Sequence, residues 1–267
     1  MESPTCSNTK SLVSAIHDKY DDDTPVEDSF CQIYVSSSAP GHVEGQLRLP
    51  KSLGMEQFGI TCAGNPEDLG KLSADVEELD LADNLLSSWD EVFLILDSLH
   101  KLTFLNLTRN PLSQLNSAPN ARYSTLKKLA LNFTNLTWET IQNLLTVLPN
   151  LEELYLSGNS YDTIDLNIPA YESLRLLQLN ENKFEEWSCV LKIDKVFPKL
   201  RTLILAHNKI STCGSVEENE SLLSHLKVLN MNNTQIAEWN ELDKLSVFKS
   251  LSDIRLASIP IIKDLRL

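Results

Sequence analysis

The chain has 267 residues, of which 42% are apolar and 22% charged, and this is enough apolar material for a sizeable core. Its 37 acidic and 23 basic residues give a formal charge of -14, which disfavours nucleic acid or an anionic membrane as the main partner. No apolar run approaches the roughly 20 residues of a membrane span, and the first ten residues lack the basic and apolar regions of a secretory signal. We therefore expect a cytosolic protein.

Residues 1–45 are expected to form an N-terminal acidic segment that is partly flexible. A short helix is predicted around Leu12–Tyr20, followed by a linker with the run DKYDDDTPVEDS (18–29). No D-x-D-x-D-G loop follows the three aspartates, so the run indicates solvated charge rather than a calcium site. Residues 46–75 are interpreted as an N-terminal capping half-repeat, because their apolar residues match the framework of the repeats that follow. These framework residues are Pro50, Leu53, Met55, Phe58 and Ile60.

Residues 76–267 contain eight copies of the pattern L-x-x-L-x-L-x-x-N. The copies begin 23 to 26 residues apart, which is the signature of leucine-rich repeats. In each copy the leucines of L-x-L point to one face of a strand and the intervening residues to the other, so stacked copies bury continuous leucine ladders. The Asn slot is expected to bind the backbone of neighbouring turns, with Thr134 and Thr234 as weaker substitutes.

Four segments between the strands have apolar residues at three- and four-residue steps and are predicted to be helical: 87–102, 137–151, 185–200 and 237–251. All four tryptophans fall at the starts of these helices, in alternate repeats, where we expect them to pack inside the stack. The predicted fold is an α/β leucine-rich-repeat solenoid, a horseshoe with a parallel β-sheet on the concave face and helices on the convex face. The repeats end without an obvious cover, so we expect the C-terminal cap to be missing.

The sequence contains none of the usual motifs of nucleotide, zinc-hydrolase or serine-hydrolase sites, and its five cysteines include no C-x-x-C pair. We therefore expect no enzyme activity, cofactor, metal or small-molecule substrate. What remains is the outward face of the strands, where only six of 24 positions are charged. The candidate protein-binding residues are Phe104, Tyr155, Leu176, Ile204, Val228 and Arg255.

Four of these residues, Tyr155, Leu176, Ile204 and Val228, lie in four neighbouring repeats. Since adjacent strands are about 4.8 Å apart, their side chains are expected to form one apolar patch that binds a partner. The alternative is that the N-terminal segment or a missing C-terminal element covers the patch.

Several stretches resemble the tubulin folding cofactor E family, among them FGITCAGNPEDL (58–69), VEELDLADNLLSSWDEV (76–92), LPNLEELYLSGNSYDTI (148–164) and RLASIPII (255–262). The run HDKYDDD (17–23), and the absence of a Gly-rich CAP-Gly domain ahead of the repeats, favour the cofactor E-like branch. In this family a ubiquitin-like domain follows the repeats, and the sequence ends before it.

The resemblance implies a cytoplasmic, cytoskeleton-associated protein that binds tubulin, either α-tubulin or the heterodimer, through its concave face and regulates heterodimer folding or stability. Because tubulin is acidic like this chain, short-range apolar and hydrogen-bond contacts are expected to supply the affinity. The repeat pattern alone leaves an alternative open, a generic leucine-rich-repeat scaffold that regulates another partner such as a phosphatase.

Overall fold

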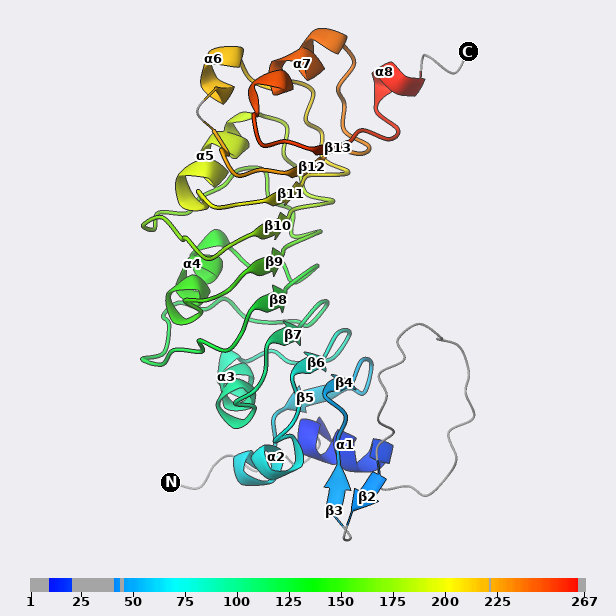
Figure 1. The fold of residues 1–267 in the computed structure, drawn as a ribbon. Helices are drawn as coiled ribbons and strands as arrows, with labels where there is room; N and C mark the ends of the chain where they lie inside the picture. The colour runs from blue at the N-terminus through cyan, green and yellow to red at the C-terminus, as the bar shows by residue number, and fades with distance from the viewer. Residues whose placement is uncertain (1–9, 21–40, 44–45, 221, 264–267) are drawn as a thin grey trace. The chain divides into compact units, whose positions relative to one another are not determined.

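The computed structural model describes residues 10–20, 41–43, 46–220 and 222–263. The chain divides between Ser113 and Gln114 into two compact units, called unit 1 and unit 2 below (Figure 1). Both units contain parallel strands with return segments that are partly helical, as the repeat pattern predicts, and unit 1 also has one antiparallel pair of strands. No helix in the described part of the chain is both long and apolar enough to cross a bilayer.

Unit 1 contains the capping half-repeat and the first repeats. Its elements are β1 (Lys10–Ser11), α1 (Leu12–Tyr20), β2 (Gly41–Val43), β3 (Gln46–Arg48), β4 (Ser52–Gly54), β5 (Ile60–Cys62), α2 (Pro66–Leu72), β6 (Glu78–Asp80), α3 (Trp89–Ser98) and β7 (Phe104–Asn106). Strand β6 pairs in parallel with both β4 and β7, and this register aligns Leu53, Leu79 and Leu105. All three leucines are at most 1% exposed. The half-repeat therefore contributes a strand to the same ladder as the full repeats.

The predicted N-terminal helix is confirmed as α1, with the bounds expected from the sequence. Leu12, Ala15 and Ile16 are fully buried, and the Lys19 ammonium donates to the Gly54 carbonyl at 2.6 Å. Desolvation by burial lowers the pKa of Lys19, although the nearby Glu56 carboxylate acts in the opposite direction. The helix therefore covers apolar surface of the half-repeat. The acidic linker predicted after the helix lies outside the described residues.

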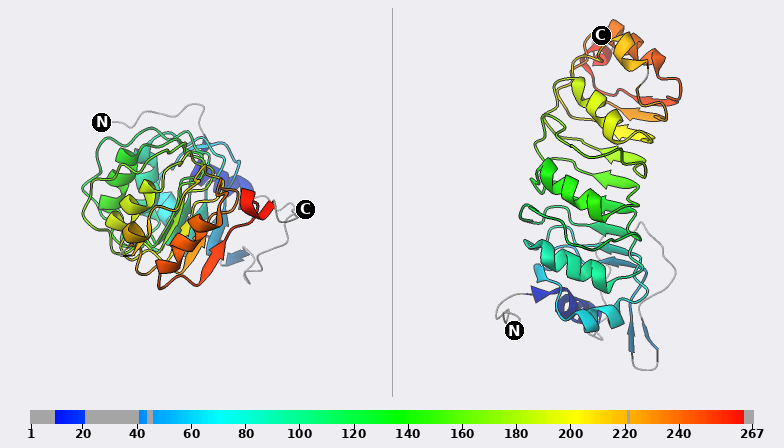
Figure 2. Two further views of the ribbon diagram at one scale, coloured as in Figure 1. Left: turned by 90° about the horizontal axis from the view of Figure 1, so that it is seen from above. Right: turned by 90° about the vertical axis from the view of Figure 1, so that its left-hand side faces the viewer.

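Unit 2 contains the remaining repeats. Its elements are β8 (Lys128–Ala130), α4 (Trp138–Val147), β9 (Glu153–Tyr155), β10 (Leu176–Gln178), α5 (Ser188–Val196), β11 (Thr202–Ile204), α6 (Val216–Asn219), β12 (Val228–Asn230), α7 (Trp239–Asp243), the 3-10 helix η1 (Lys244–Val247), β13 (Asp253–Arg255) and α8 (Pro260–Lys263). Strands β8 to β13 pair in parallel in chain order, with helices α4 and α5 on the return side (Figures 1 and 2). The predicted leucine-rich-repeat fold is therefore confirmed.

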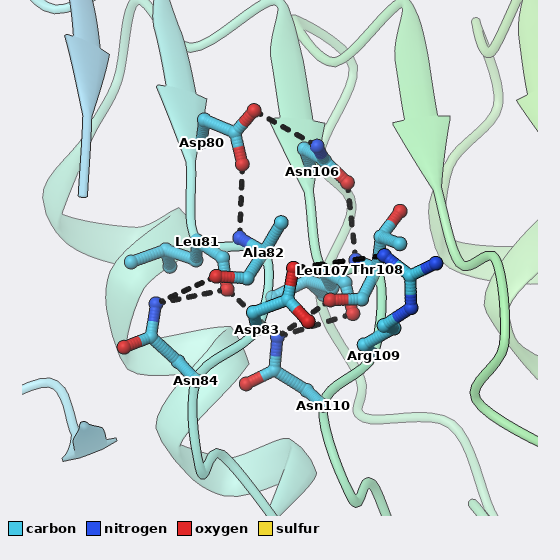
Figure 3. Close-up of polar contacts among 10 residues, drawn as sticks. All are labelled: Asp80, Leu81, Ala82, Asp83, Asn84, Asn106, Leu107, Thr108, Arg109 and Asn110. Carbon is cyan, nitrogen blue, oxygen red and sulfur yellow. Dashed lines mark hydrogen bonds and ion pairs between the residues drawn. The ribbon is translucent and has the colours of Figure 1, made fainter. Parts of the chain in front are cut away.

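The asparagine slots bind the backbone as predicted. All five, Asn84, Asn110, Asn159, Asn182 and Asn208, are 2–6% exposed. Asn110 illustrates the pattern in unit 1. Its Oδ1 accepts from the Leu86 N–H at 3.0 Å, and its Nδ2 donates to the Leu81 carbonyl at 2.8 Å (Figure 3). Thr134 and Thr234 instead donate from their hydroxyls to the carbonyl three residues earlier, at 2.8 Å in each case, and the Thr134 hydroxyl also lies 3.2 Å from the Asn159 Oδ1. Each asparagine therefore ties two neighbouring repeats together.

The predicted packing of the tryptophans holds for three of the four. Trp89, Trp138 and Trp187 are 3–7% exposed, whereas Trp239 is 54% exposed. The prediction is wrong for Trp239. In the middle of the stack the next repeat covers the tryptophan ring, but no described residue covers the ring of Trp239. Helix capping follows the sequence in α3 and α4, whose N-cap residues are Ser88 and Thr137.

Candidate functional site

The outer face of unit 2 consists of two columns of side chains. The middle residue is buried in β8 to β12 but is 40% exposed in β13, where it is Ile254. The first and third residues of each strand lie on the outer face, where Ala130 alone among them is buried, and the strands pair without a register shift. The first column is Lys128, Glu153, Leu176, Thr202, Val228 and Asp253. The second column is Ala130, Tyr155, Gln178, Ile204, Asn230 and Arg255.

The four residues expected to form an apolar patch lie on four consecutive strands but alternate between the columns. Leu176 and Val228 are in the first column, and Tyr155 and Ile204 are in the second. With about 4.8 Å between strands and about 3.3 Å per residue, diagonal neighbours are roughly 8 Å apart at their Cα atoms. All four side chains are half-buried. We call this arrangement the apolar zigzag. The polar residues between its members are Gln178, Thr202 and Asn230.

Tyr155 is held in place by its neighbours. Its hydroxyl donates a short hydrogen bond to the Glu153 carboxylate, which also accepts an ion pair from the Lys128 ammonium at 3.3 Å. Burial raises the pKa of the Tyr155 phenol, and the bond to Glu153 raises it further. The phenol is therefore neutral at physiological pH.

The other two candidate residues lie apart from the zigzag. Arg255 is exposed on β13 and pairs with Asp253 at 3.2 Å. Phe104 belongs to unit 1, where it is half-buried and in register with Glu78 of the neighbouring strand. Five of the six candidates therefore lie in unit 2, and four of these make up the apolar zigzag.

The charges of the outer columns differ between the units. In unit 2 the charged residues are Lys128, Glu153, Asp253 and Arg255, two of each sign, and they form two ion pairs. In unit 1 Glu78 and Asp80 are both acidic. The outer face of unit 2 is consequently neutral, although the chain as a whole carries a formal charge of -14.

The polar side chains on the outer face of unit 1 bind one another (Figure 3). Asp80 accepts from the Ala82 N–H and from the Asn106 Nδ2, both at 2.9 Å, and Asn106 Oδ1 accepts from the Thr108 N–H at 3.0 Å. Sequence reasoning missed these contacts. The sequence did contain a signal for the two bonds to backbone N–H groups. An Asp or Asn at the end of a strand commonly accepts from the N–H two residues later, which is the pattern of an Asx turn.

The 24 positions expected to face outward include, in each repeat, the residue two positions after the strand, and in part this expectation is wrong. Ala82, Ser157 and Ala206 are such residues but are only 4–9% exposed. The chain turns inward after the strand to bring the asparagine slot into the core, so these residues go with it. The surface available to a partner is therefore narrower than the sequence suggests.

The groups in the described residues that could bind a metal or act as nucleophiles are few. No cluster of three or more His, Cys, Asp or Glu side chains among them could hold a metal ion. The Cys189 and Cys213 thiols are buried, and burial raises the pKa of each to about 12, so neither is a nucleophile at neutral pH. An open hollow of about 360 Å³ lies near Arg122 and Val147, away from the two columns.

Comparison with known proteins identifies relatives of the chain. The family model for leucine-rich repeats in two copies matches residues 198–244. The rat tubulin-specific chaperone cofactor E-like protein is 35% identical over 235 residues, which cover 86% of this chain and 55% of that protein. The human tubulin-specific chaperone E is 31% identical over 262 residues, 91% of this chain and 50% of that protein.

Solved structures support the fold alone. A crystal structure of a TLR13–ssRNA13 complex matches with a TM-score of 0.55 at 22% identity, covering 78% of this chain and 28% of the other. The chain spans about half the length of its curated relatives. The chain is therefore a leucine-rich-repeat homologue of the tubulin-specific chaperone cofactor E-like proteins.

Proposed function

We propose that the chain is a non-enzymatic, cytoplasmic tubulin-binding module that regulates the folding or stability of the tubulin heterodimer. The support from homology is that relatives covering 86% and 91% of the chain are tubulin-specific chaperones or cofactor E-like proteins by name. Because the chain spans only about half of each relative, the activity of the whole relative does not follow from the alignment alone.

The observation that favours the outer face of unit 2 as the binding surface is that the apolar zigzag lies on a face with no net charge. Tyr155, Leu176, Ile204 and Val228 are half-buried rather than covered, and the charges beside them cancel. Covering the rest of such a side chain contributes on the order of 1 kcal/mol. A neutral face also avoids like-charge repulsion with an acidic partner. Affinity is then expected to depend little on salt concentration.

The experiment is a binding measurement with a charge placed at the centre of the zigzag. Ile204→Asp puts a carboxylate on the outer face of β11, where a covering partner would have to desolvate it. The matched control is Val216→Asp on α6, because Val216 is also apolar and in unit 2 but lies on the return side and is 44% exposed. An aspartate in the first turn of a helix is also compatible with that helix.

Each variant is mixed with tubulin heterodimer at micromolar concentration and separated under native conditions, after circular dichroism has shown that it is folded. We expect the original chain and Val216→Asp to bind equally, and Ile204→Asp to bind at least about tenfold more weakly, the loss typical of a central interface residue. Equal binding by all three would refute the zigzag as the contact surface. Failure of the original chain to bind would refute the proposed function for this chain.

A further inference from the structure

Three tryptophans share one environment in the stack. Trp89, Trp138 and Trp187 are 3–7% exposed, and each donates its indole N–H to an oxygen of the following repeat. The acceptors are the Ser113 carbonyl at 2.7 Å, the Thr163 carbonyl at 2.7 Å and the Asn219 Oδ1 at 2.8 Å. In the interior of the stack, the return segment of the next repeat therefore covers the ring and accepts its hydrogen bond.

Trp239 has the equivalent position in its repeat but not this environment. It is 54% exposed, and its indole N–H has no acceptor among the described residues. The helix that it begins, α7, has five residues and none of them is buried. By contrast, α5 has nine residues and buries Cys189, Val190, Ile193 and Val196. The return side of this repeat is therefore exposed, whereas the next repeat covers the corresponding surface of the interior repeats.

The neighbouring strand β13 is open in the same way. Ile254 is aligned with Leu229 of β12 and occupies the same framework slot, yet it is 40% exposed while Leu229 is 1% exposed. Strand β13 pairs with β12 along one edge, and no described strand pairs with its other edge. Elements α7 and β13 both lie at the same end of unit 2 (Figures 1 and 2).

We propose that this end of unit 2 is a docking surface for one further unit of the repeat type, consisting of a return segment followed by a strand. The return segment would lie over Trp239 and supply a carbonyl or carboxamide oxygen to its indole, as Asn219 does for Trp187. The strand would pair in parallel with β13 and cover Ile254 with an apolar side chain. Only such a unit satisfies the indole, the open strand edge and the framework isoleucine together.

The chain itself provides a probe of this surface. Residues 251–262 align with residues 200–211 of an earlier repeat, so a copy of residues 212–250 can replace residues 263–267 in frame. The copied Asn219 then comes to the position where it can accept from Trp239, and the copied β12 comes to the open edge of β13. The tryptophan in the copied segment is replaced by phenylalanine (Trp239→Phe), so the extended chain has the same four tryptophans as the original chain.

The decisive readout is the effect of Trp239→Ala in the two backgrounds. In the original chain we expect the melting temperature to change little, because an exposed ring contributes little to stability. In the extended chain the same substitution should lower it by several degrees, as we also expect for Trp187→Ala in either background. The extension should also raise the melting temperature and reduce the quenching of Trp239 fluorescence by acrylamide. A control extension with Asn219→Leu in the copied segment should recover only part of this protection.

Three results would overturn the proposal. The first is an extended, folded chain in which Trp239 remains as easily quenched as before and Trp239→Ala remains neutral. The second needs no extension, and is a loss of stability from Trp239→Asp in the original chain as large as that from Trp187→Asp, because the surface would then already be covered. Protection of Trp239 that rises with the concentration of the original chain would also contradict it, since the occupant would be a second copy. None of these results depends on tubulin binding.

Discussion

Replacement of Asn182 by alanine tests the asparagine ladder, the row of five buried turn asparagines. Asn182 suits this test because both its Oδ1 and its Nδ2 bond to backbone groups. Its Oδ1 accepts from the N–H groups of Asn159 and Tyr161 at 3.1 and 3.0 Å. Its Nδ2 donates to the carbonyls of Leu156 and Leu179 at 3.1 and 3.0 Å. The side chain is buried, so water does not readily replace these bonds. One substitution therefore removes partners from backbone groups of two neighbouring repeats.

The expected loss follows from the two N–H groups left without an acceptor. A buried donor without a partner costs about 1–3 kcal/mol, so Asn182→Ala should lower the free energy of unfolding of unit 2 by about 2–4 kcal/mol after partial relaxation. Asn182→Thr should cost about 1 kcal/mol less, because a hydroxyl in this slot can still donate to the carbonyl three residues earlier. Thr134 and Thr234 make that bond at 2.8 Å.

The assay is urea unfolding followed by tryptophan fluorescence and by far-ultraviolet circular dichroism. The control is Asn240→Ala on α7, an exposed asparagine whose replacement should change stability by no more than about 0.5 kcal/mol. If Asn182→Ala lowered the free energy of unfolding no more than this control, the hydrogen bonds of the buried asparagines would not stabilise the stack as proposed. The same conclusion would follow if the threonine variant were no more stable than the alanine variant.

Two further predictions concern packing and pH. Gly158 and Gly59 both have left-handed φ angles, 67° and 71°, but a Cβ on Gly158 would lie 2.1 Å from the Phe133 ring whereas nothing lies within 4 Å of one on Gly59. In thermal melts Gly158→Ala should therefore cost about 1–3 kcal/mol more than Gly59→Ala, and equal losses would show that the ring yields freely. Burial raises the pKa of Cys189 and Cys213 from 9.0 to about 12, so the unfolded chain loses these protons above about pH 9 while the folded chain keeps them. The free energy of unfolding should fall between pH 9 and 12, and it should fall less steeply when both residues are replaced by alanine; an unchanged slope would contradict this origin of the pH dependence.

The repeat framework was predictable because each slot has one physical requirement. A leucine at the middle of the strand and an asparagine in the turn suffice to identify the unit, and Leu177 and Asn182 are buried as the pattern requires. The exposure of Trp239 was not predictable, because the sequence of a repeat is the same whether or not another unit covers it. The same holds for Ile254, because it fills a framework slot that the interior repeats bury, yet it is 40% exposed.

The candidate surface was predictable in composition but not in arrangement. The alternation within L-x-L identifies Leu176 and Ile204 as outward-facing, and the structure agrees. Their separation into two columns depends on whether a residue precedes or follows the central leucine, and combining the columns suggested a continuous patch. The bond between Tyr155 and Glu153 joins side chains of one strand and has no signal in the repeat pattern.

The most direct test of the central claim is site-specific photocrosslinking. A benzoylphenylalanine replaces Ile204 on the outer face of unit 2 or, in a second variant, the exposed Lys192 on α5. Each variant is irradiated with tubulin heterodimer at the same concentration, and the products are identified by mass. We predict a one-to-one crosslink to tubulin from position 204 and none from position 192. A crosslink from position 192 alone, or none from either position, would contradict tubulin binding through the outer strand face.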